Sequence, residues 1–556
     1  MASDAWNADE SWLSHLERRA ALGHIDRRGF LKLAAALGVQ ATLTDFAFAA
    51  PGDRQIAAAY DYIVVGAGSA GCAVAARLAE GGARKVLLLE AGGSDTGRTS
   101  LTSPHAWGAN CGKDVDWGYQ TTPQARANNR VFDWPRGKVV GGSSSINAMI
   151  WVWGHQADFD GWAYAGNEGW DYARVKPIFQ SIETSTRADA GAGRGISGPM
   201  HVGSMSRANP LNQAFFESCR QAGHAVHADV NGPIREGAGL MDLSVKDDKR
   251  FSVAHGYLMP ALQRENFTLV TGATVEKLLF AGTRCTGVRV RIDGNVRDIV
   301  ANEETILSSG ALDSPRLLLQ SGIGNADELR KLGIKPVADL PGVGENLHDH
   351  LMLNAFVAEV REPLNHNGFR SDSHVFYRTS GNGFVPDIQT IFVPAALNPS
   401  LQRNQGYSML VGLVRPQSRG RLKLATSEPG GPLLIDPGYL TAQADLDALV
   451  DGAERARDIG MASGFASIRK RDTGQLPRGR EAIADYVRRN FQTYWHPVGT
   501  CAMGLHERAV VNPQLQVRGV ERLRIADASV MPTITTGNTN APAIMIGERA
   551  ARMIVA

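Results

Sequence analysis

Residues 60–71 read YDYIVVGAGSAG, an apolar run that predicts a β-strand and then a turn of closely spaced glycines. A helix is expected over residues 72–80, and a second strand over residues 86–89 ends at Glu90. A strand, a glycine turn, a helix and a second strand in this order are typical of a dinucleotide-binding unit. The glycine pattern alone would be a weak signal in a chain with 61 glycines, but this context supports it.

Each glycine of the turn has its own physical role in such a unit. Gly66 allows the tight turn, Gly68 lets a pyrophosphate approach the backbone, and Gly71 allows the helix and strand to pack closely. Ser69 and Ala70 lie in the turn before the helix and are expected to contact the cofactor, and the helix N-terminus is expected to face the phosphates. The turn therefore predicts a binding site for an adenine dinucleotide.

Glu90 follows the second strand, where an acidic side chain accepts a hydrogen bond from a ribose hydroxyl. An acidic residue at this position argues against a ribose 2′-phosphate, which a basic residue would favour. These residues do not show whether the dinucleotide is NAD or FAD.

The composition is that of a globular protein with a large core. The chain has 556 residues, of which 43% are hydrophobic and 21% are charged, so two domains are expected. The net charge of +2 provides no reason to expect nucleic acid or an acidic membrane surface as a partner. The five cysteines have no CxxC pair and predict neither a zinc cluster nor a disulfide scaffold: Cys72, Cys111, Cys219, Cys285 and Cys501.

Residues 1–50 differ from the rest of the chain. Residues 26–32 read DRRGFLK, and an apolar run over residues 33–43 precedes the small residues at 47–50. This order resembles a twin-arginine export signal with a cleavage site near Ala50, and it predicts a periplasmic protein. The apolar run is shorter than the about 20 residues that span a bilayer, so no stable membrane span is expected. The alternative is a surface amphipathic helix with two adjacent arginines that have no targeting role.

A second motif lies at residues 135–149, which read PRGKVVGGSSSINAM, a loop of small residues that suits a flat polar ring system. Together with GALDSPRLLLQSGIG at residues 310–324, this loop resembles the two signature patterns of the glucose-methanol-choline (GMC) oxidoreductases, which bind FAD. The resemblance continues through VGENLHDH at residues 343–350 and covers nearly the whole chain after residue 58. It implies that the cofactor is FAD.

The resemblance implies an α/β fold, with a Rossmann-like FAD-binding domain and a discontinuous substrate domain built on an antiparallel sheet. The FAD-binding domain is expected from residues 58–155, 225–335 and 495–555. The substrate domain is expected from residues 156–224 and 336–494.

The resemblance also implies how FAD is held. Covalent members of the family bond the flavin to a histidine just before the loop asparagine. Here Ile146 precedes Asn147, so FAD is expected to be non-covalent. Val275 matches the position whose backbone meets the adenine, although by itself it would be interpreted as an ordinary strand residue. The same resemblance implies further cofactor contacts for Gly142, Asn147, Ala148, Met149, Trp495, Asp527, Ala528, Asn538 and Pro542.

Two C-terminal segments carry the expected chemistry, YWHPVGTCAMG at residues 494–504 and TGNTNAP at residues 536–542. Oxidising an alcohol through a flavin requires the hydroxyl to lose a proton and the carbon to transfer a hydride to flavin N5. By resemblance to the family His496 is the base, and an ordinary histidine pKa of about 6.5 suits that role. The resemblance assigns Asn540 to hold the developing alkoxide by a hydrogen bond. Without the motif, one histidine among 14 would be taken as structural.

The remaining motifs are expected around the flavin. Apolar residues at helical spacing predict a helix over residues 542–554, with Pro542 in its first turn. The positive N-terminus of this helix is expected to face the flavin pyrimidine, where reduction places negative charge. His348 and His350 look like a metal pair but have no third ligand at a recognised spacing, so no metal is expected. They are interpreted as part of a structural or FAD-adjacent loop.

The substrate domain is expected to supply an apolar or aromatic pocket. The apolar run at residues 406–414 predicts a buried strand, although its periodicity also allows a short buried helix, and residues 419–424 predict a turn and the next strand. Tyr494, Trp495 and Phe251 are candidate pocket residues, with ordinary core packing as the alternative. The expected substrate is a primary alcohol, aliphatic or aromatic, in preference to a free sugar.

The electron acceptor is open between a quinone or cytochrome and O2. Export to the periplasm favours a dehydrogenase that uses a quinone or cytochrome, and the chain has no CxxCH haem motif. Two further classes of function stay open: a lyase or a light-driven enzyme on the same FAD scaffold, and a non-catalytic flavin-binding protein.

Overall fold

The structure is a computed structural model that describes residues 56–187, 193–204, 210–227, 229, 231–232, 236–364, 373–379 and 383–555. The predicted export signal at residues 1–50 lies outside the described residues. Within the described ranges, no helix has both the length and the apolar character needed to cross a membrane.

Two large sheets organise the fold, and the first has the strand order β10-β2-β1-β13-β12-β11, with β24 also paired to β13. The strands β10, β2, β1, β13 and β24 run parallel, whereas β13, β12 and β11 are antiparallel neighbours. This sheet collects strands from distant parts of the chain: β1 (Ala59–Val65), β2 (Val86–Leu89), β10 (Phe267–Val270), β11 (Ala273–Ala281), β12 (Arg284–Ile292), β13 (Asn295–Leu307) and β24 (Leu523–Ile525).

The predicted order of strand, turn, helix and strand at the start of the first sheet is confirmed. The strands β1 and β2 match the apolar runs, and their residues are nearly all buried, as expected for strands covered on both faces. The helix α3 (Ser69–Leu78) begins three residues earlier than the predicted 72–80, because the glycine turn is shorter than expected.

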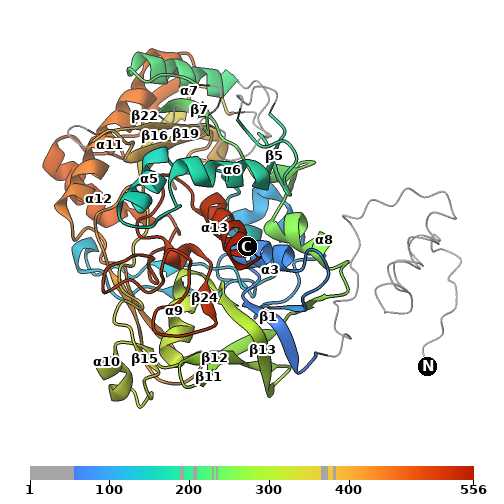
Figure 1. The fold of residues 1–556 in the computed structure, drawn as a ribbon. Helices are drawn as coiled ribbons and strands as arrows, with labels where there is room; N and C mark the ends of the chain where they lie inside the picture. The colour runs from blue at the N-terminus through green and yellow to red at the C-terminus, as the bar shows by residue number, and fades with distance from the viewer. Residues whose placement is uncertain are drawn as a thin grey trace, which may run out of the picture.

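The C-terminal helix α13 (Asn540–Val555) packs against α3, and both lie over the first sheet in Figure 1. A side chain at Gly547 of α13 would place its Cβ 2.5 Å from the backbone oxygen of Ala70 in α3. Because Gly547 has no side chain, α13 at the C-terminal end can pack closely against α3 beside the glycine turn.

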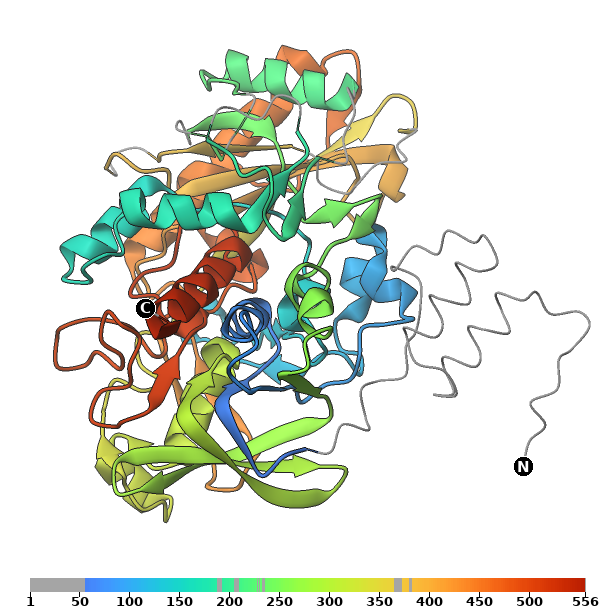
Figure 2. The same ribbon diagram turned by 45° about the vertical axis from the view of Figure 1, so that its right-hand side comes forward.

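The second sheet has the strand order β22-β16-β19-β18-β17-β7, with β23 also paired to β16, and every pair is antiparallel. Figures 1 and 2 show this sheet at the opposite end of the molecule from the first sheet, with α13 between them. The helices α7 (Pro210–Gln221) and α11 (Gln443–Met461) contact its strands on one face. Its strands are β7 (Gly237–Leu240), β16 (Leu351–Val360), β17 (Ser373–Tyr377), β18 (Ile388–Val393), β19 (Gly406–Leu413), β22 (Arg469–Asp472) and β23 (Gln492–Thr493).

Two details differ from the sequence-based expectation. β7 lies within residues 225–335, which were expected in the FAD-binding domain, but it pairs with β17 in the second sheet. The predicted strand after residue 419 exists as β20 (Arg421–Leu424), but it pairs only with β21 (Leu433–Asp436) in a separate hairpin. Tertiary packing decides which strands pair, and a local apolar pattern carries no information about it.

The other elements are short or connect the two sheets. The helices α5 (Gln156–Tyr164) and α6 (Tyr172–Ile182) follow the loop of small residues at 135–149, here called the flavin loop. The helix α6 contacts α13. The remaining ones are α4 (Thr99–Thr102), α8 (Met259–Ala261), α9 (Gly310–Gln320), α10 (Ala326–Lys331), α12 (Arg480–Asn490), β3 (Tyr119–Gln120), β4 (Asp133–Trp134), β5 (Glu183–Ser185), β6 (Met200–Val202), β8 (Val245–Lys246), β9 (Lys249–Arg250), β14 (Ile323–Gly324) and β15 (Ala338–Asp339).

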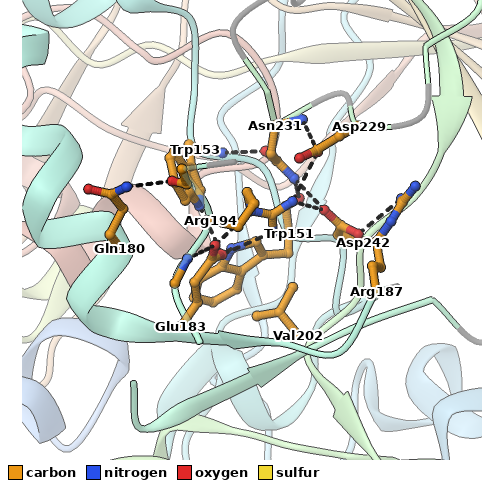
Figure 3. Close-up of polar contacts among 12 residues, drawn as sticks. Trp151, Trp153, Gln180, Glu183, Arg187, Arg194, Val202, Asp229, Asn231 and Asp242 are labelled. Atoms are coloured by element: carbon orange, nitrogen blue, oxygen red, sulfur yellow. Dashed lines mark hydrogen bonds and ion pairs between the residues drawn. The ribbon is translucent and has the colours of Figure 1, made fainter. Parts of the chain in front are cut away.

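A buried ionic cluster joins side chains from separate segments between residues 183 and 242. Figure 3 shows Arg194 between Glu183, Asp229 and Asp242, with contacts of 2.6 Å, 2.9 Å and 2.8 Å to their oxygens. The backbone oxygen of Asp242 also accepts a hydrogen bond from the backbone N–H of Trp151, at 2.8 Å. The cluster therefore fixes the chain just after the flavin loop at residues 135–149.

Candidate active site

One cavity runs along the carboxyl ends of β1 and β2 and reaches the second sheet. Most of the predicted site residues line it, although they come from five separate regions of the sequence. These are Gly66, Gly68, Ser69, Ala70, Glu90, Gly142, Asn147, Ala148, Met149, Val275, Trp495, His496, Asp527, Ala528, Asn538 and Asn540. Two predicted residues do not line the cavity: Gly71 packs behind the turn, and Pro542 is buried in the first turn of α13, where the neighbouring Ala543 lines the cavity instead.

The glycine turn is tightly packed and ends at an uncapped helix N-terminus. Gly66 has a φ of +100°, and a Cβ there would lie 2.6 Å from the backbone oxygen of Ser308. A Cβ at Gly71 would lie 1.9 Å from the backbone oxygen of Gly66, so helix and strand touch at this point. The N-cap of α3 is Gly68, and no side chain caps it, which leaves the first N–H groups of the helix open to the cavity.

Glu90 is held by the turn itself. Its carboxylate accepts hydrogen bonds from the backbone N–H groups of Ala67, at 2.9 Å, and Gly92, at 2.8 Å. Burial raises the pKa of Glu90 to about 7. The remaining lone pairs of the two oxygens can accept from a ribose hydroxyl.

The flavin loop closes over the glycine turn. Gly142 has a φ of +53°, and a Cβ there would lie 2.7 Å from the Cα of Gly68. Asn147 accepts hydrogen bonds from the backbone N–H of Met149, at 2.9 Å, and from Arg250 Nη1, at 2.8 Å. Met149 has a φ of +62°, in the left-handed region that a non-glycine residue rarely adopts. The loop is thus held in a defined conformation beside the cavity.

Arg250 is a buried residue that holds the flavin loop, and the sequence motifs did not reveal it. Its guanidinium also donates to the backbone oxygens of Leu101, at 2.8 Å, and Ser144, at 3.1 Å. Burial lowers the pKa of Arg250 to about 9. No sequence signal marks it, because its partners lie about 100 and 150 residues earlier in the chain.

His496 lies at the junction of the two sheets and makes three contacts. Its Nε2 is 3.3 Å from Asn538 Nδ2, its Nδ1 is 3.0 Å from His350 Nδ1, and its backbone N–H donates to Asp349 Oδ1 at 2.6 Å. Burial lowers the pKa of His496 well below its usual value, and repulsion from a protonated His350 and from Arg136 lowers it further. The imidazole is therefore neutral at neutral pH.

With Asn538 Nδ2 assigned as the amide atom that faces His496, the contacts fit one tautomer for each histidine. Asn538 Nδ2 can only donate, so His496 Nε2 carries a lone pair and His496 Nδ1 carries the proton. His496 Nδ1–H then donates to His350 Nδ1. Burial lowers the pKa of His350 to about 3, so His350 stays neutral and accepts this hydrogen bond. Nε2 of His496 is the basic atom on the cavity side, where it contacts Asn538 Nδ2.

The structure gives the two asparagines of the TGNTNAP segment different partners. Asn538 contacts His496, whereas Asn540 Oδ1 accepts a hydrogen bond from Ser69 Oγ at 2.7 Å. Asn538 Oδ1 is buried and has no hydrogen-bond partner within the described chain. Asn538 is therefore in contact with His496, whereas Asn540, the predicted partner, lines the same cavity and joins α13 to α3 through Ser69.

The two histidines of the VGENLHDH segment make different contacts. His348 is structural, since its Nδ1 lies 2.6 Å from the backbone oxygen of Asn346 and its Nε2 accepts from the backbone of Ile534 at 2.9 Å. His350, interpreted with it as part of a structural or FAD-adjacent loop, contacts His496. Within the described residues, no group of three histidine, cysteine or acidic residues is arranged to hold a metal ion.

Asp527 and Val275 line the nucleotide part of the cavity. Asp527 accepts hydrogen bonds from the backbone of Gly310, at 2.9 Å, and from Ser314 Oγ, at 2.5 Å, so it ties β24 to the start of α9. Val275 lies on β11 beside the same space.

The aromatic candidates separate into two groups. Tyr494 and Trp495 line the cavity, and Trp495 has a φ of +61°. Phe251 does not line it and stacks edge-on against His201, with ring centroids 4.9 Å apart. Phe251 was therefore a wrong candidate for the substrate pocket.

Comparison with known proteins gives the family. Residues 60–352 and residues 416–547 match the N-terminal and C-terminal family models described as GMC oxidoreductase. The chain is 39% identical to choline dehydrogenase, mitochondrial, from Mus musculus, with 89% of each chain covered. It is 37% identical to alcohol dehydrogenase [acceptor] from Pseudomonas putida, with 89% of this chain and 96% of the relative covered. It is also 37% identical to oxygen-dependent choline dehydrogenase from Rhizobium johnstonii, with 89% and 95% covered.

Solved structures agree with the sequence relatives. Pyridoxine 4-oxidase from Mesorbium loti has a TM-score of 0.84 and 33% identity, covering 88% of this chain and 98% of the other. Formate oxidase has a TM-score of 0.84 and 25% identity, covering 90% and 98%. The chain therefore belongs to the GMC oxidoreductase family, as the signature motifs predicted, and it is an FAD-dependent oxidoreductase that acts on alcohols.

Proposed function

We propose that this protein oxidises a primary alcohol, aliphatic or aromatic, to an aldehyde, with His496 as the base and Asn538 as the donor that holds the developing alkoxide. The observation that carries the proposal is the neutral His496, whose Nε2 faces Asn538 inside the cavity that begins at the glycine turn. A secondary alcohol would give a ketone by the same chemistry.

The proposed reaction divides the two hydrogens of the alcohol between protein and cofactor. The substrate hydroxyl takes the place of the Asn538 contact at His496 Nε2, and its proton passes to the lone pair of this neutral imidazole. Asn538 Nδ2 donates to the substrate oxygen as negative charge develops there. His350 holds the imidazole of His496 from the opposite side. FAD supplies the hydride acceptor, so the alcohol loses two electrons and two hydrogens in total.

The residues of the cavity fit FAD held without a covalent bond. The open N-terminus of α3 suits the pyrophosphate, Glu90 suits a ribose, and the backbone near Val275 suits the adenine. Ile146 stands where covalent members have their histidine, and its side chain has no nucleophile. Acid precipitation is expected to release all of the flavin into the supernatant, and flavin that stays with the protein would contradict this.

The N-terminus of α13 supports the flavin placement. Asn540 and Ala543 line the cavity, so the positive end of a helix of 16 residues lies beside it. We assign the Rossmann-like FAD-binding domain to the first sheet and the substrate domain to the second sheet, which meet at His496.

The acceptor is proposed to be a quinone or a cytochrome. The name of the Pseudomonas putida relative, alcohol dehydrogenase [acceptor], supports this, whereas the oxygen-dependent choline dehydrogenase and pyridoxine 4-oxidase support the alternative of an O2-using oxidase. Stopped-flow mixing of the reduced enzyme with air separates them. Slow reoxidation is expected, and fast recovery of oxidised flavin would establish the oxidase.

Anaerobic mixing with alcohols tests the reaction itself. Loss of the absorbance of oxidised flavin is expected with a primary alcohol and not with His496→Ala. A lyase on this scaffold would leave the flavin oxidised, and a light-driven enzyme would need illumination. A non-catalytic flavin protein would respond to no alcohol.

The periplasmic location is proposed from the sequence of residues 26–50 alone, which combines the arginine motif, the apolar run and the cleavage-like site. Replacing Arg27 and Arg28 by lysine is expected to retain the protein in the cytoplasm of a bacterium with a twin-arginine pathway. Export of the double variant would contradict the proposal.

A further inference from the structure

The end of the cavity next to His496 has an apolar wall built by three neighbouring strands. Ile391 on β18 pairs with Leu410 on β19, and Met352 on β16 pairs with Gly412, two residues further along β19. Because side chains alternate along a strand, Ile391, Leu410 and Met352 face the same side of the sheet. All three line the cavity, and Met352 and Leu410 are only partly buried.

The polar groups near this wall are already engaged by the protein. Tyr494 Oη donates to Gln389 Oε1 at 3.1 Å, and Gln389 Nε2 lies 2.9 Å from His374 Nδ1. Trp107 and Trp495 line the same cavity and pack edge-on, with ring centroids 6.1 Å apart. The wall therefore presents mainly methyl, methylene and aromatic carbon to a ligand.

The carboxylates that line the cavity within the described residues belong to its nucleotide end. These are Glu90, Asp313 and Asp527. Each is already bound by groups of the protein: Glu90 by the backbone of Ala67 and Gly92, Asp313 by Tyr119 and Arg316, and Asp527 by Gly310 and Ser314. None of the three is on the strands of the apolar wall.

The charged side chains next to His496 do not favour binding of a cation either. Arg136 Nη2 donates to the backbone oxygen of Trp495 at 2.6 Å, and its positive charge lowers the pKa of His496. Asp349 is the nearby carboxylate, but it is buried, does not line the cavity, and accepts hydrogen bonds from the His496 backbone and from Thr493 Oγ1, at 2.6 Å and 2.5 Å.

We propose that the substrate is an uncharged alcohol with an apolar chain or ring, and that a quaternary ammonium alcohol such as choline is rejected by this wall. The inference rests on the proposed alcohol oxidation at His496. An ammonium group would lose its hydration against Met352, Ile391 and Leu410 without gaining a carboxylate partner. The faces of aromatic rings attract a cation, but this attraction is weaker than the cost of burying an unpaired charge. An apolar group gains free energy in the same place.

Choline and 3,3-dimethylbutan-1-ol test this directly, because they differ mainly in a charged nitrogen against an uncharged carbon. The holoenzyme is mixed anaerobically with each alcohol, and the second-order rate of flavin reduction is measured. The uncharged alcohol is expected to reduce the flavin at least 100-fold faster. Equal or faster reduction by choline would overturn the inference and leave alcohol oxidation standing. No reduction by either alcohol, nor by 1-hexanol and benzyl alcohol, would contradict the proposed function as well.

A matched pair of variants tests the wall. Met352→Glu adds a carboxylate, and Met352→Gln adds a polar group of the same size without the charge. The ratio of the choline rate to the 3,3-dimethylbutan-1-ol rate is expected to be at least 10-fold higher in Met352→Glu than in Met352→Gln. Equal ratios would overturn the assignment of this wall to the substrate. If Met352→Glu does not retain FAD, Leu410→Glu and Leu410→Gln make the same comparison from β19.

Discussion

At the scale of single residues, burial keeps the histidines around the cavity neutral. The pKa of His496 is well below its usual value, and the pKa values of His350 and His374 are both about 3, in each case chiefly through burial. His374 connects to the site through Gln389 and Tyr494, whose ring centroid lies 4.5 Å from that of His496. A base that is already neutral can accept the alcohol proton without first losing one.

This burial predicts a pH-dependent contribution of His374 to stability. The imidazole takes up a proton near pH 6.5 in the unfolded chain but only near pH 3 in the folded protein. The contribution of His374 to the free energy of unfolding is therefore fully present above pH 6.5. It is lost as the pH falls toward 3, by about 1.4 kcal/mol per pH unit.

Urea unfolding of the wild type and of His374→Gln, at several pH values between 7 and 4, measures this contribution. The free energy of unfolding is expected to fall more steeply with falling pH in the wild type than in His374→Gln. Glu90 and Asp349, whose pKa values burial raises, act in the opposite direction, but they are present in both proteins and cancel in the difference. Identical slopes would contradict the prediction.

The two asparagines of the C-terminal segment predict separable defects. Asn538→Ala is expected to slow anaerobic flavin reduction by about 100-fold with FAD retained, because it removes the donor next to the reacting oxygen. Asn540→Ala removes the hydrogen bond to Ser69 and is expected to weaken FAD retention, with less than about a 10-fold effect on reduction. Stopped-flow absorbance measures both rates. The reverse pattern would return the role of alkoxide partner to Asn540, as the motif indicated.

At the scale of secondary structure elements, the glycine turn works because β1, α3 and the flavin loop approach within van der Waals distance. Gly66→Ala is expected to destabilise the protein and prevent FAD binding, because the φ of +100° and the 2.6 Å approach to Ser308 leave no space for a methyl group. Gly93→Ala is the control, since a Cβ at Gly93 would meet no atom within 4 Å. Flavin content and thermal unfolding measure the effect, and equal behaviour of the two variants would contradict it.

The ionic cluster of Figure 3 predicts an element-scale effect on stability. Arg194→Met leaves Glu183, Asp229 and Asp242 buried without their shared cation, which is expected to cost about 3–5 kcal/mol. Arg289→Met is the matched control, because Arg289 and Asp298 form an exposed pair whose loss is expected to have little effect. Urea unfolding compares them, and an equally mild effect of Arg194→Met would show that the cluster does not hold the flavin loop.

At the scale of the whole molecule, the cavity joins both sheets, so FAD is expected to stabilise both. Protein stripped of its flavin is expected to unfold at a lower temperature than the holoenzyme, and excess FAD at about 100 times its Kd is expected to restore about 2.7 kcal/mol. Differential scanning calorimetry at increasing FAD concentrations measures this. A transition temperature that does not change with FAD concentration would contradict the prediction.

Local sequence was sufficient for the parts of the fold that depend on neighbouring residues. β1 and β2 match the predicted apolar runs, and Gly66 and Gly71 make the tight turn and the close helix-strand contact that their spacing indicated. The helix expected over residues 542–554 is confirmed as α13, which extends a little further at each end. Such features follow from backbone geometry and from apolar periodicity, which are properties of a short segment.

The amino-acid sequence by itself determined the nucleotide-binding unit, the family and the segments that supply the active site. Only the tertiary structure decided which asparagine lies beside His496, that His350 supports its imidazole, and that β7 joins the second sheet. It also decided that the wall at the His496 end of the cavity is apolar. The physical reason is that these contacts join residues tens to hundreds of positions apart, so they depend on how buried elements pack and not on any local pattern.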